Sequence, residues 1–471
     1  MNADNSSSSP RSSQLPHPSS SPVPTVPPNP ASGHDRSGTA VPPISRSLWR
    51  SRAYRDWFAA DTADGCAVSL RTFSIPLVGL ALSGSPFVAG LLVTAESAIG
   101  LVLMSFGGAI ADRHDRRRLM IALGLIGLTL SAVATGMLAS GTMTTLAFAV
   151  LVVLFAVTNG LLGPSNDAML KSIVPMERFA KAQAIREARE SCVELSGGVI
   201  GGLLYRLAGW LPFLVSTILY GIASATALRL PKRTGADGIK AVDAAATSPA
   251  MPTVTATSGD NPSFLTQFIE GWRWTLTRRV ILAAIVQGAI INVACVGSIV
   301  GVQIMLAARG TDAALIGLVG TVTGIAAFAG SLAAGWLVDH VPTGGIIMLT
   351  FAVLTAAMIP LLFTDFYAVI VVCLAAPALL FPALNAGELG FIYGRTPDDM
   401  QGRVSTVFET TVGVPGALAP ALVGWLLQAP GFGFRAVMML VVVCSAAGLV
   451  LACITATRTI PLPEHWSQVE L

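Results

Sequence analysis

The chain has 471 residues, of which 53% are hydrophobic and only 12% are charged, and its formal net charge is +3. An average soluble domain carries about 25% charged residues, so this chain has too few polar side chains to cover a surface that faces water. The composition argues against a soluble enzyme and against a nucleic-acid binder, and it indicates a protein whose main partner is a lipid bilayer.

The first segment, residues 1–45, is dominated by Ser and Pro and has no apolar run that could serve as a signal peptide. Such a composition cannot bury a core, so we expect a disordered tail. A second interpretation is that this tail binds a partner or regulates the protein.

From residue 46 onward, uncharged runs of about 20 residues alternate with short segments that carry charges, Gly or Pro. This pattern predicts twelve membrane-spanning helices, and hence an all-α membrane protein with two six-helix halves at 46–230 and 279–456. The expected helices are 54–82, 86–110, 117–138, 145–170, 186–208, 211–230, 279–306, 313–338, 344–364, 366–393, 402–427 and 432–456.

The two halves are joined by residues 231–278. Residues 231–262 are polar and small and contain Pro, which predicts a flexible linker. Just after them, Phe264, Phe268 and Trp272 share one helical face, which favours a helix lying on the membrane surface. An ordinary solvated linker helix is the alternative. The remaining residues, 457–471, are expected to form a C-terminal tail.

The placement of Lys and Arg predicts the orientation. If both termini lie on one side of the membrane, the loops on that side contain most of the Lys and Arg residues, whereas the opposite loops contain only Arg206, Arg309 and Arg435. Because loops rich in Lys and Arg stay in the cytoplasm, both termini are expected to be cytoplasmic, in a bacterial inner (plasma) membrane.

The two halves match each other along their sequences. The segment 90–112 aligns without gaps on 317–339, and a second alignment relates helix 5 to helix 11. The identical or similar pairs are Gly90/Gly317, Thr94/Thr321, Gly108/Gly335, Asp112/Asp339, Pro175/Pro397, Lys181/Arg403, Glu187/Glu409 and Gly202/Gly424. Internal repeats of this kind are typical of transporters that expose a site between their halves to alternate sides of the membrane.

The junction of helices 2 and 3 contains a strong local motif, GAIADRHDRRR, at residues 108–118. Its Gly permits close helix packing, and its Asp can interact with a helix N-terminus. Topology alone would require only the arginines. The second half keeps the Gly and the Asp but not the arginines, which favours a structural gate. The expected gating residues are Gly108, Asp112, Arg113, Arg116, Arg117, Gly335 and Asp339.

This motif resembles the loop 2–3 signature of the major facilitator superfamily, Gly-x-x-x-Asp-Arg-x-Gly-Arg-Arg, and the helix number and central loop are also similar over about residues 46–460. The overall character is similar to the bacterial efflux branch with enterobactin-exporter-like and macrolide-efflux-like members. The resemblance implies that the motif locks the outward-facing state. Asp115 replaces the second Gly of the signature.

Helix 5 resembles the antiporter motif of that family, Gly-Pro-x-x-Gly-Gly, with Gly198 in place of Pro. Helix 4 lacks the Arg that many proton antiporters carry there. In a membrane, a run of glycines is a packing surface for another helix and not a phosphate loop. The expected helix-packing residues are Gly197, Gly198, Gly201 and Gly202.

Several expected helices carry ionisable residues, which cost about 2.5–3.5 kcal/mol each on insertion scales and therefore usually face a cavity or a partner. Arg71 and Glu96 lie nearest the midplane, and we expect an ion pair or proton site there, with a purely structural pair as the alternative. A carboxylate in a dry cavity can bind and release protons as the cavity opens.

The side-chain amides of Gln287, Asn292 and Asn385 are candidate substrate contacts, or else they form hydrogen bonds between helices. The cavity candidates are Asp61, Asp64, Arg71, Glu96, Asp167, Gln287, Asn292, Asn385 and Glu388. Asp61 also lies near the expected cytoplasmic mouth with Glu187 and Glu409, where gating salt bridges are expected.

The chain has no CxxC pair, no GxxxxGK[ST] loop and no HExxH motif, so we expect no disulfide, metal, cofactor or enzymatic activity. These features together predict a monomeric secondary transporter that works by alternating access. The expected cargo is an amphipathic organic compound, such as a drug, antibiotic or siderophore, exchanged for protons. The direction, export, is what the resemblance to the efflux branch implies. The alternatives are an uptake symporter of the same superfamily and a membrane sensor that does not transport.

Overall fold

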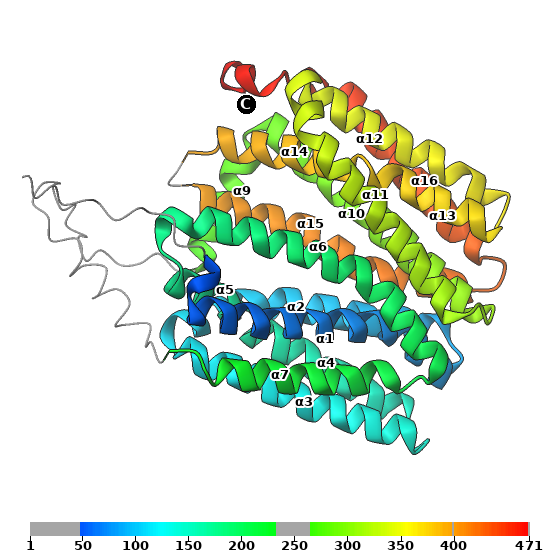
Figure 1. The fold of residues 1–471 in the computed structure, drawn as a ribbon. Helices are drawn as coiled ribbons and strands as arrows, with labels where there is room; N and C mark the ends of the chain where they lie inside the picture. Colours follow the sequence, from blue (N-terminus) through cyan, green and yellow to red (C-terminus); the bar gives the residue numbers. More distant parts are fainter. Residues whose placement is uncertain (1–47, 232–263, 398–399, 470–471) are drawn as a thin grey trace, which may run out of the picture. The chain divides into compact units, whose positions relative to one another are not determined.

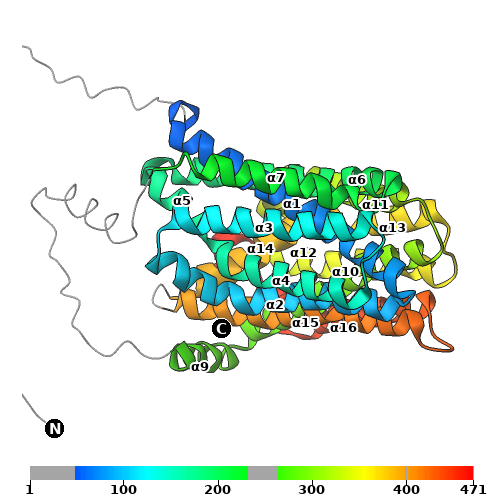
Figure 2. The ribbon, with the colours of Figure 1, turned by 90° about the horizontal axis from the view of Figure 1, so that it is seen from below.

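The computed structural model describes residues 48–231, 264–397 and 400–469, and all regular elements in these ranges are helices (Figures 1 and 2). The expected tail at 1–45 and nearly all of the expected linker at 231–262 lie outside the described residues. The described helices form one compact unit that begins at Ser47.

The first half follows the predicted helices closely. After a short 3₁₀ helix (Leu48–Arg50), its helices are α1 (Arg52–Ser83), α2 (Pro86–Arg113), α3 (Arg116–Ala139), α4 (Thr145–Leu162), α5 (Pro164–Ile173), α6 (Met176–Leu207) and α7 (Leu211–Ala227). The fourth expected span is divided into α4 and α5 at Gly163 and Pro164, because a proline has no N–H to continue the helical ladder.

The second half begins after a helix that packs against it. Its elements are α9 (Phe264–Leu276), α10 (Arg279–Ala308), α11 (Ala313–His340), α12 (Thr343–Met358) with η2 (Ile359–Leu362), α13 (Tyr367–Ala378), α14 (Phe381–Arg395), α15 (Gln401–Gln428), α16 (Phe434–Ile454), η3 (Ala456–Thr459) and η4 (Pro463–Gln468). The tenth expected span is divided into α13 and α14, with Pro377 and Pro382 on either side of the break.

Ten helical spans among the described residues are long and apolar enough to cross a membrane, counting α4 with α5 and α13 with α14 as one span each. Helix α7 is apolar but shorter. Helix α6 begins ten residues before the expected start, at Met176, and its first half carries several charged residues. With α6 and α7, the described bundle has the twelve predicted spans and an all-α fold.

The helices run back and forth between two ends of the bundle. We name the end at which α1 begins and α16 ends the proximal end, and the other end the distal end; the proximal end lies at the left in Figure 1. At the proximal end, Arg117 Nη2 donates to Leu228 O, which joins the start of α3 to the end of α7. At the distal end, Arg206 pairs with Asp312, which joins the two halves.

Two seams join the halves, and both lie toward the distal end. In the α2–α15 seam, a Cβ atom on Gly424 would lie 3.0 Å from the Cα of Phe87. In the α6–α11 seam, a Cβ on Gly202 would lie 3.1 Å from the Cα of Ala314. No side chain fits at either glycine without moving the neighbouring backbone, so these glycines allow the helices to touch.

The two seams are built from residues that the internal repeat makes equivalent. Gly424 corresponds to Gly202, and its partner Phe87 corresponds to Ala314 when the alignment of 90–112 on 317–339 is continued three residues upstream. The outermost contacts are equivalent too. Ser85 Oγ bonds Gln428 Oε1 in one seam, and Arg206 Nε lies 3.0 Å from Asp312 Oδ2 in the other. The halves are therefore related by a pseudo-twofold axis between the seams.

The C-terminal segment after α16 packs against the proximal end of the second half. The backbone carbonyl of Ile460 accepts a bond from Gly344 N, which satisfies an amide at the start of α12. Trp466 packs edge-on against Phe391 of α14, and its indole Nε1 donates to Thr343 Oγ1 at 3.1 Å. The expected tail at 457–471 is thus ordered over its described part and joins α12 and α14.

Candidate functional site

The centre of the first half contains an ion pair between two helices. Arg71 of α1 is 1% exposed, Glu96 of α2 is 12% exposed, and Arg71 Nη1 lies 2.6 Å from Glu96 Oε1. The guanidinium lies over the Phe155 ring of α4 at 4.4 Å, and Thr72 Oγ1 also donates to the glutamate. The structure thus brings Arg71 and Glu96 together near the middle of both helices.

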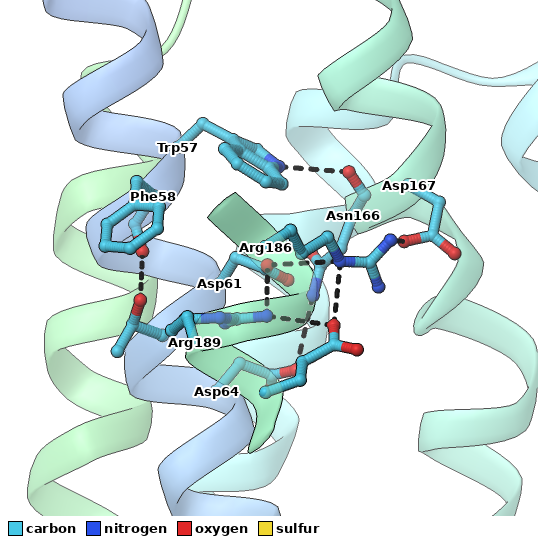
Figure 3. Close-up of polar contacts among 10 residues, drawn as sticks. Trp57, Phe58, Asp61, Asp64, Asn166, Asp167, Arg186 and Arg189 are labelled. Carbon is cyan, nitrogen blue, oxygen red and sulfur yellow. Dashed lines mark hydrogen bonds and ion pairs between the residues drawn. The ribbon is translucent and has the colours of Figure 1, made fainter. Parts of the chain in front are cut away.

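A second group of charges lies nearer the proximal end, where α1, α5 and α6 meet (Figure 3). Asp61 of α1 is buried, and Arg189 Nη2 lies 2.9 Å from its Oδ2. Arg186 reaches the same carboxylate at 3.7 Å and also pairs with Asp167 and with Glu190, the latter at 2.8 Å. This group, the α1–α5–α6 charge network, ties three helices of the first half to one another.

Asp64 extends this network one turn further into the bundle. Asn166 Nδ2 of α5 donates to Asp64 Oδ2 at 3.2 Å, and the Asn166 carbonyl accepts from the indole of Trp57 (Figure 3). The short helix α5 starts at Pro164, so Asn166 lies in its first turn. The proline break in the fourth span therefore places an amide against the acids of α1.

Expectations from the sequence did not include Arg186, Arg189 or Asn166 among the site residues. Arg186 and Arg189 were counted only toward topology, because they were expected near the start of a span. The available signal was the spacing of Arg186 and Glu190, four residues apart on one helix, which is the spacing of an ion pair.

The polar residues of the second half lie in different surroundings. Gln287 of α10 is buried and donates to Thr457 Oγ1 at 3.0 Å, so it holds the C-terminal segment. Asn292 of α10 packs its amide against Gly416 of α15. Asn385 of α14 is exposed, whereas Glu388, one turn further along the same helix, is only 6% exposed. The structure does not bring these four residues into one cluster.

The expected gating residues lie apart from the other half. Asp112 is 77% exposed, and Arg116 of the same half is 3.9 Å from it. A Cβ on Gly108, or on the equivalent Gly335, would have no described atom within 4 Å. Arg113 and Asp339 are exposed.

Three residues of the same loop hold the first half together. Asp115, which departs from the family signature, caps α3 by accepting from Arg117 N at 3.0 Å. Arg116 Nη1 donates to Ala168 O of α5, and Arg117 donates to Leu228 O after α7. Within the described residues, these arginines therefore join the proximal ends of α3, α5 and α7.

The proximal parts of the helices that form the seams carry exposed polar side chains. Glu187 and Glu194 of α6 and Glu409 of α15 are all exposed. Glu409 accepts only from Ser405 of its own helix among the described hydrogen bonds. Polar groups in the middle of membrane helices face water or protein and not lipid, so we expect these residues to face water or polar groups of the protein.

The glycines of α6 serve two neighbours. Gly197 packs against Ser69 and Gly201 against Phe73, both on α1, whereas Gly198 and Gly202 face α11 of the other half. The distal loops contain a further ion pair, Arg309 with Asp365. This arginine donates a hydrogen bond that holds the pKa of the exposed Asp365 carboxyl below its ordinary value.

A first prediction concerns the α1–α5–α6 charge network. Asp61→Asn is expected to lower the free energy of unfolding by about 1.5–3 kcal/mol, because two guanidinium groups lose their shared charged acceptor. Unfolding by rising SDS in mixed micelles measures the change. Arg52→Gln, which removes an exposed partner of Asp56 on the same helix, is the matched control and should leave stability unchanged. Equal effects of the two substitutions would contradict the assigned role of Asp61.

A sequence profile described as Major Facilitator Superfamily matches residues 62–306 and 282–470. No curated protein sequence matches the chain.

Several solved structures resemble the fold. A bacterial homologue of the iron transporter ferroportin, in an inward-facing state, is 14% identical with a TM-score of 0.62, and the match covers 87% of this chain and 99% of that one. The nucleoside transporter NupG is 11% identical with a TM-score of 0.61, covering 86% and 98%. A bacterial homologue of the lysosomal transporter Spinster is 13% identical with a TM-score of 0.60, covering 90% and 99%.

Proposed function

The chain belongs to the major facilitator superfamily, and from this premise we propose that it exports an amphipathic organic compound from the cytoplasm in exchange for protons. It is a membrane transporter and not an enzyme. In the proposal it works as a monomer in the inner (plasma) membrane of a bacterium. The two six-helix halves rock about a central site, with the proximal end in the cytoplasm.

The observation that carries this proposal is the buried Arg71–Glu96 pair at 2.6 Å. Burying two charges requires a large desolvation free energy, which a purely structural bundle avoids by using apolar residues. An ion pair kept at the centre of two helices is therefore best explained by a task that needs charge there, such as binding a substrate or responding to a proton. Asp64, about two turns of helix away from Arg71 on α1, adds an acid to the same half.

The arrangement of the halves supports alternating access. Both seams are closed at the distal end, and exposed polar residues such as Glu194, Asn385 and Glu409 lie further along the bundle. In the proposal this is the inward-facing state. The orientation is supported by the many arginines at the proximal end, since such loops stay in the cytoplasm.

In the same proposal, the loop 2–3 motif is the cytoplasmic gate in its disengaged position. Asp112 is exposed and Gly108 has open space around it. Closing the proximal end would bring them against the other half, next to the start of α15. Gly335 and Asp339 would then engage the start of α6 in the pseudo-equivalent way.

Accumulation assays with ethidium and with a macrolide antibiotic test the proposed function. Bacterial cells that express the protein should accumulate less of at least one probe, and a protonophore that collapses the pH gradient should remove the difference. Glu96→Gln should abolish the effect, because the charge that pairs with Arg71 is lost. Glu464→Gln, at an exposed position in η4, is the control and should behave as the unmodified protein.

Two other outcomes would support the rival functions. Higher accumulation in expressing cells would indicate an uptake symporter. No difference for either probe, together with no effect of Glu96→Gln, would favour a sensor that does not transport.

A further inference from the structure

Glu388 of α14 is a buried acid without a partner. It is 6% exposed, and its Oε1 has no hydrogen-bond partner among the described residues. The carboxyl group lies over Gly288 of α10, where a Cβ atom would be 3.7 Å from Oε1 and 3.7 Å from the Phe408 ring of α15. The acid thus lies where α10, α14 and α15 meet.

The surroundings of Glu388 on its proximal side are apolar. One turn further along α14 begins a fully buried cluster, which we name the α10–α14–α15 cluster. Its members are Ile281, Ala284, Ile285, Ile392, Val404 and Val407. This cluster packs on the proximal side of Glu388 and shields the carboxyl group on that side.

No cation faces Glu388 from the elements packed around it. On α10 the neighbouring polar residue is Gln287, a neutral amide that is turned toward Thr457. Arg395 of α14 donates to Val469 O, and on α15 Arg403 pairs with Glu270 of α9. Arg279 at the start of α10 and Glu409 of α15 are exposed. So are the charged or titratable groups of the remaining neighbours, Asp339, His340, Glu464 and His465, and α12 and α13 carry no Asp, Glu, Lys, Arg or His.

An ionised carboxylate cannot remain in such a place, because an isolated buried charge lacks both water and a countercharge. The other candidate acids differ on this point. Glu96 lies against Arg71, and Asp64 accepts from Asn166. The charged forms of Glu96 and Asp64 have partners, whereas a charged Glu388 would have none among the described residues.

We propose that Glu388 holds a proton in this inward-facing state and that it, rather than Glu96, is the group whose protonation is coupled to transport. This proposal rests on the proposed function and names the proton site within it. In the outward-facing state the O–H bond forms with a proton from water on the distal side, and in the inward-facing state it breaks when the α10–α14–α15 cluster opens. The proton then passes to cytoplasmic water, and no other reactant is needed.

The break between α13 and α14 supplies a means of opening the cluster. The helical ladder is interrupted around Leu379 and Leu380, with Pro377 before the break and Pro382 after it. Because α14 is a separate helix, it can tilt without moving α13. Such a tilt would carry Glu388 away from Gly288 and toward the side of α14 on which Asn385 is exposed.

Infrared spectroscopy of the full-length protein in nanodiscs, at neutral pH and without substrate, tests the proposal. Selective ¹³C labelling of glutamate side chains should shift the C=O stretch of one protonated carboxyl group, which identifies it as a glutamate. The band should disappear in Glu388→Gln and remain in Glu96→Gln and Asp64→Asn. If Glu388→Gln does not fold, Glu388→Asp should keep a band that no longer responds to glutamate labelling.

The absence of such a band from the unmodified protein, or its persistence in Glu388→Gln, would overturn the proposal. A second measurement uses proteoliposomes and ethidium. Glu388→Gln should still move ethidium down its concentration gradient, but a pH gradient should no longer change the rate. If the unmodified protein does not transport ethidium at all but shows the infrared band of a protonated glutamate that Glu388→Gln removes, the proposed function fails and the proton site stands.

Discussion

Replacing Arg71 by leucine is expected to lower the free energy of unfolding by about 3–5 kcal/mol, because the substitution leaves the Glu96 carboxylate, only 12% exposed, without its countercharge. The substitution also removes the contact between the Arg71 guanidinium and the Phe155 ring. Unfolding in mixed micelles with rising SDS measures the effect. Transport of any substrate should be lost together with stability.

The double variant Arg71→Leu/Glu96→Leu separates stability from function. Removing both charges should restore much of the lost stability, since two apolar side chains of similar volume can pack together and leave no unpaired charge. Transport should remain absent. The matched control is Arg309→Leu, because Arg309 and Asp365 are 46% and 53% exposed and such a pair contributes about 0–1 kcal/mol. If the double variant is as unstable as Arg71→Leu, or if it transports, the role given to this pair is wrong.

Gly202→Leu is expected to abolish transport and to open the distal end of the bundle. A leucine at this position has no space against the backbone of Ala314, so α6 and α11 must separate. In the proposed rocking motion the halves move as bodies, so the other seam should separate as well. The equivalent substitution Gly424→Leu should have the same effect, since its neighbour is the backbone of Phe87.

A cysteine at Thr94 reports on this opening. Thr94 is buried in the α2–α15 seam, where its hydroxyl accepts from Ala421 N. In a background without the natural cysteines, Thr94→Cys should react with an external, membrane-impermeant thiol reagent only when Gly202→Leu is present. Gly136→Leu is the control, because a side chain there meets open space. Labelling that is equal in all three backgrounds would show that the seams do not open together.

The helices and the equivalence of the two halves could be predicted largely from the sequence. Long apolar runs predicted the spans, and the alignment of 90–112 with 317–339 predicted equivalent helices, because glycines such as Gly90 and Gly317 recur where backbones touch. Arg71 and Glu96 could be paired from their depth together with the expected adjacency of helices 1 and 2. Each of these features depends on the order of residue types along one helix or two neighbouring helices.

Other features depend on contacts between residues far apart in the chain. The C-terminal residues looked like a tail, since nothing local shows that Trp466 packs on Phe391. Arg186 and Arg189 looked like topology signals, since Asp61 is more than one hundred residues away. The burial of Glu388 depends on how α10 and α15 cover it, and a sequence pattern along α14 alone does not carry this information.

The equivalence of the two seams has a consequence for how such a chain could have begun. In the internal repeat, α2 is equivalent to α11, and α6 is equivalent to α15. Each half therefore contains both helix types that meet in a seam, α2 and α6 in the first half and α11 and α15 in the second, so each half carries a surface complementary to its own copy. Two identical six-helix units would meet through two identical interfaces, as in a symmetric dimer. The charged pair Arg206–Asp312 and the neutral pair Ser85–Gln428 then mark where the duplicated units have diverged.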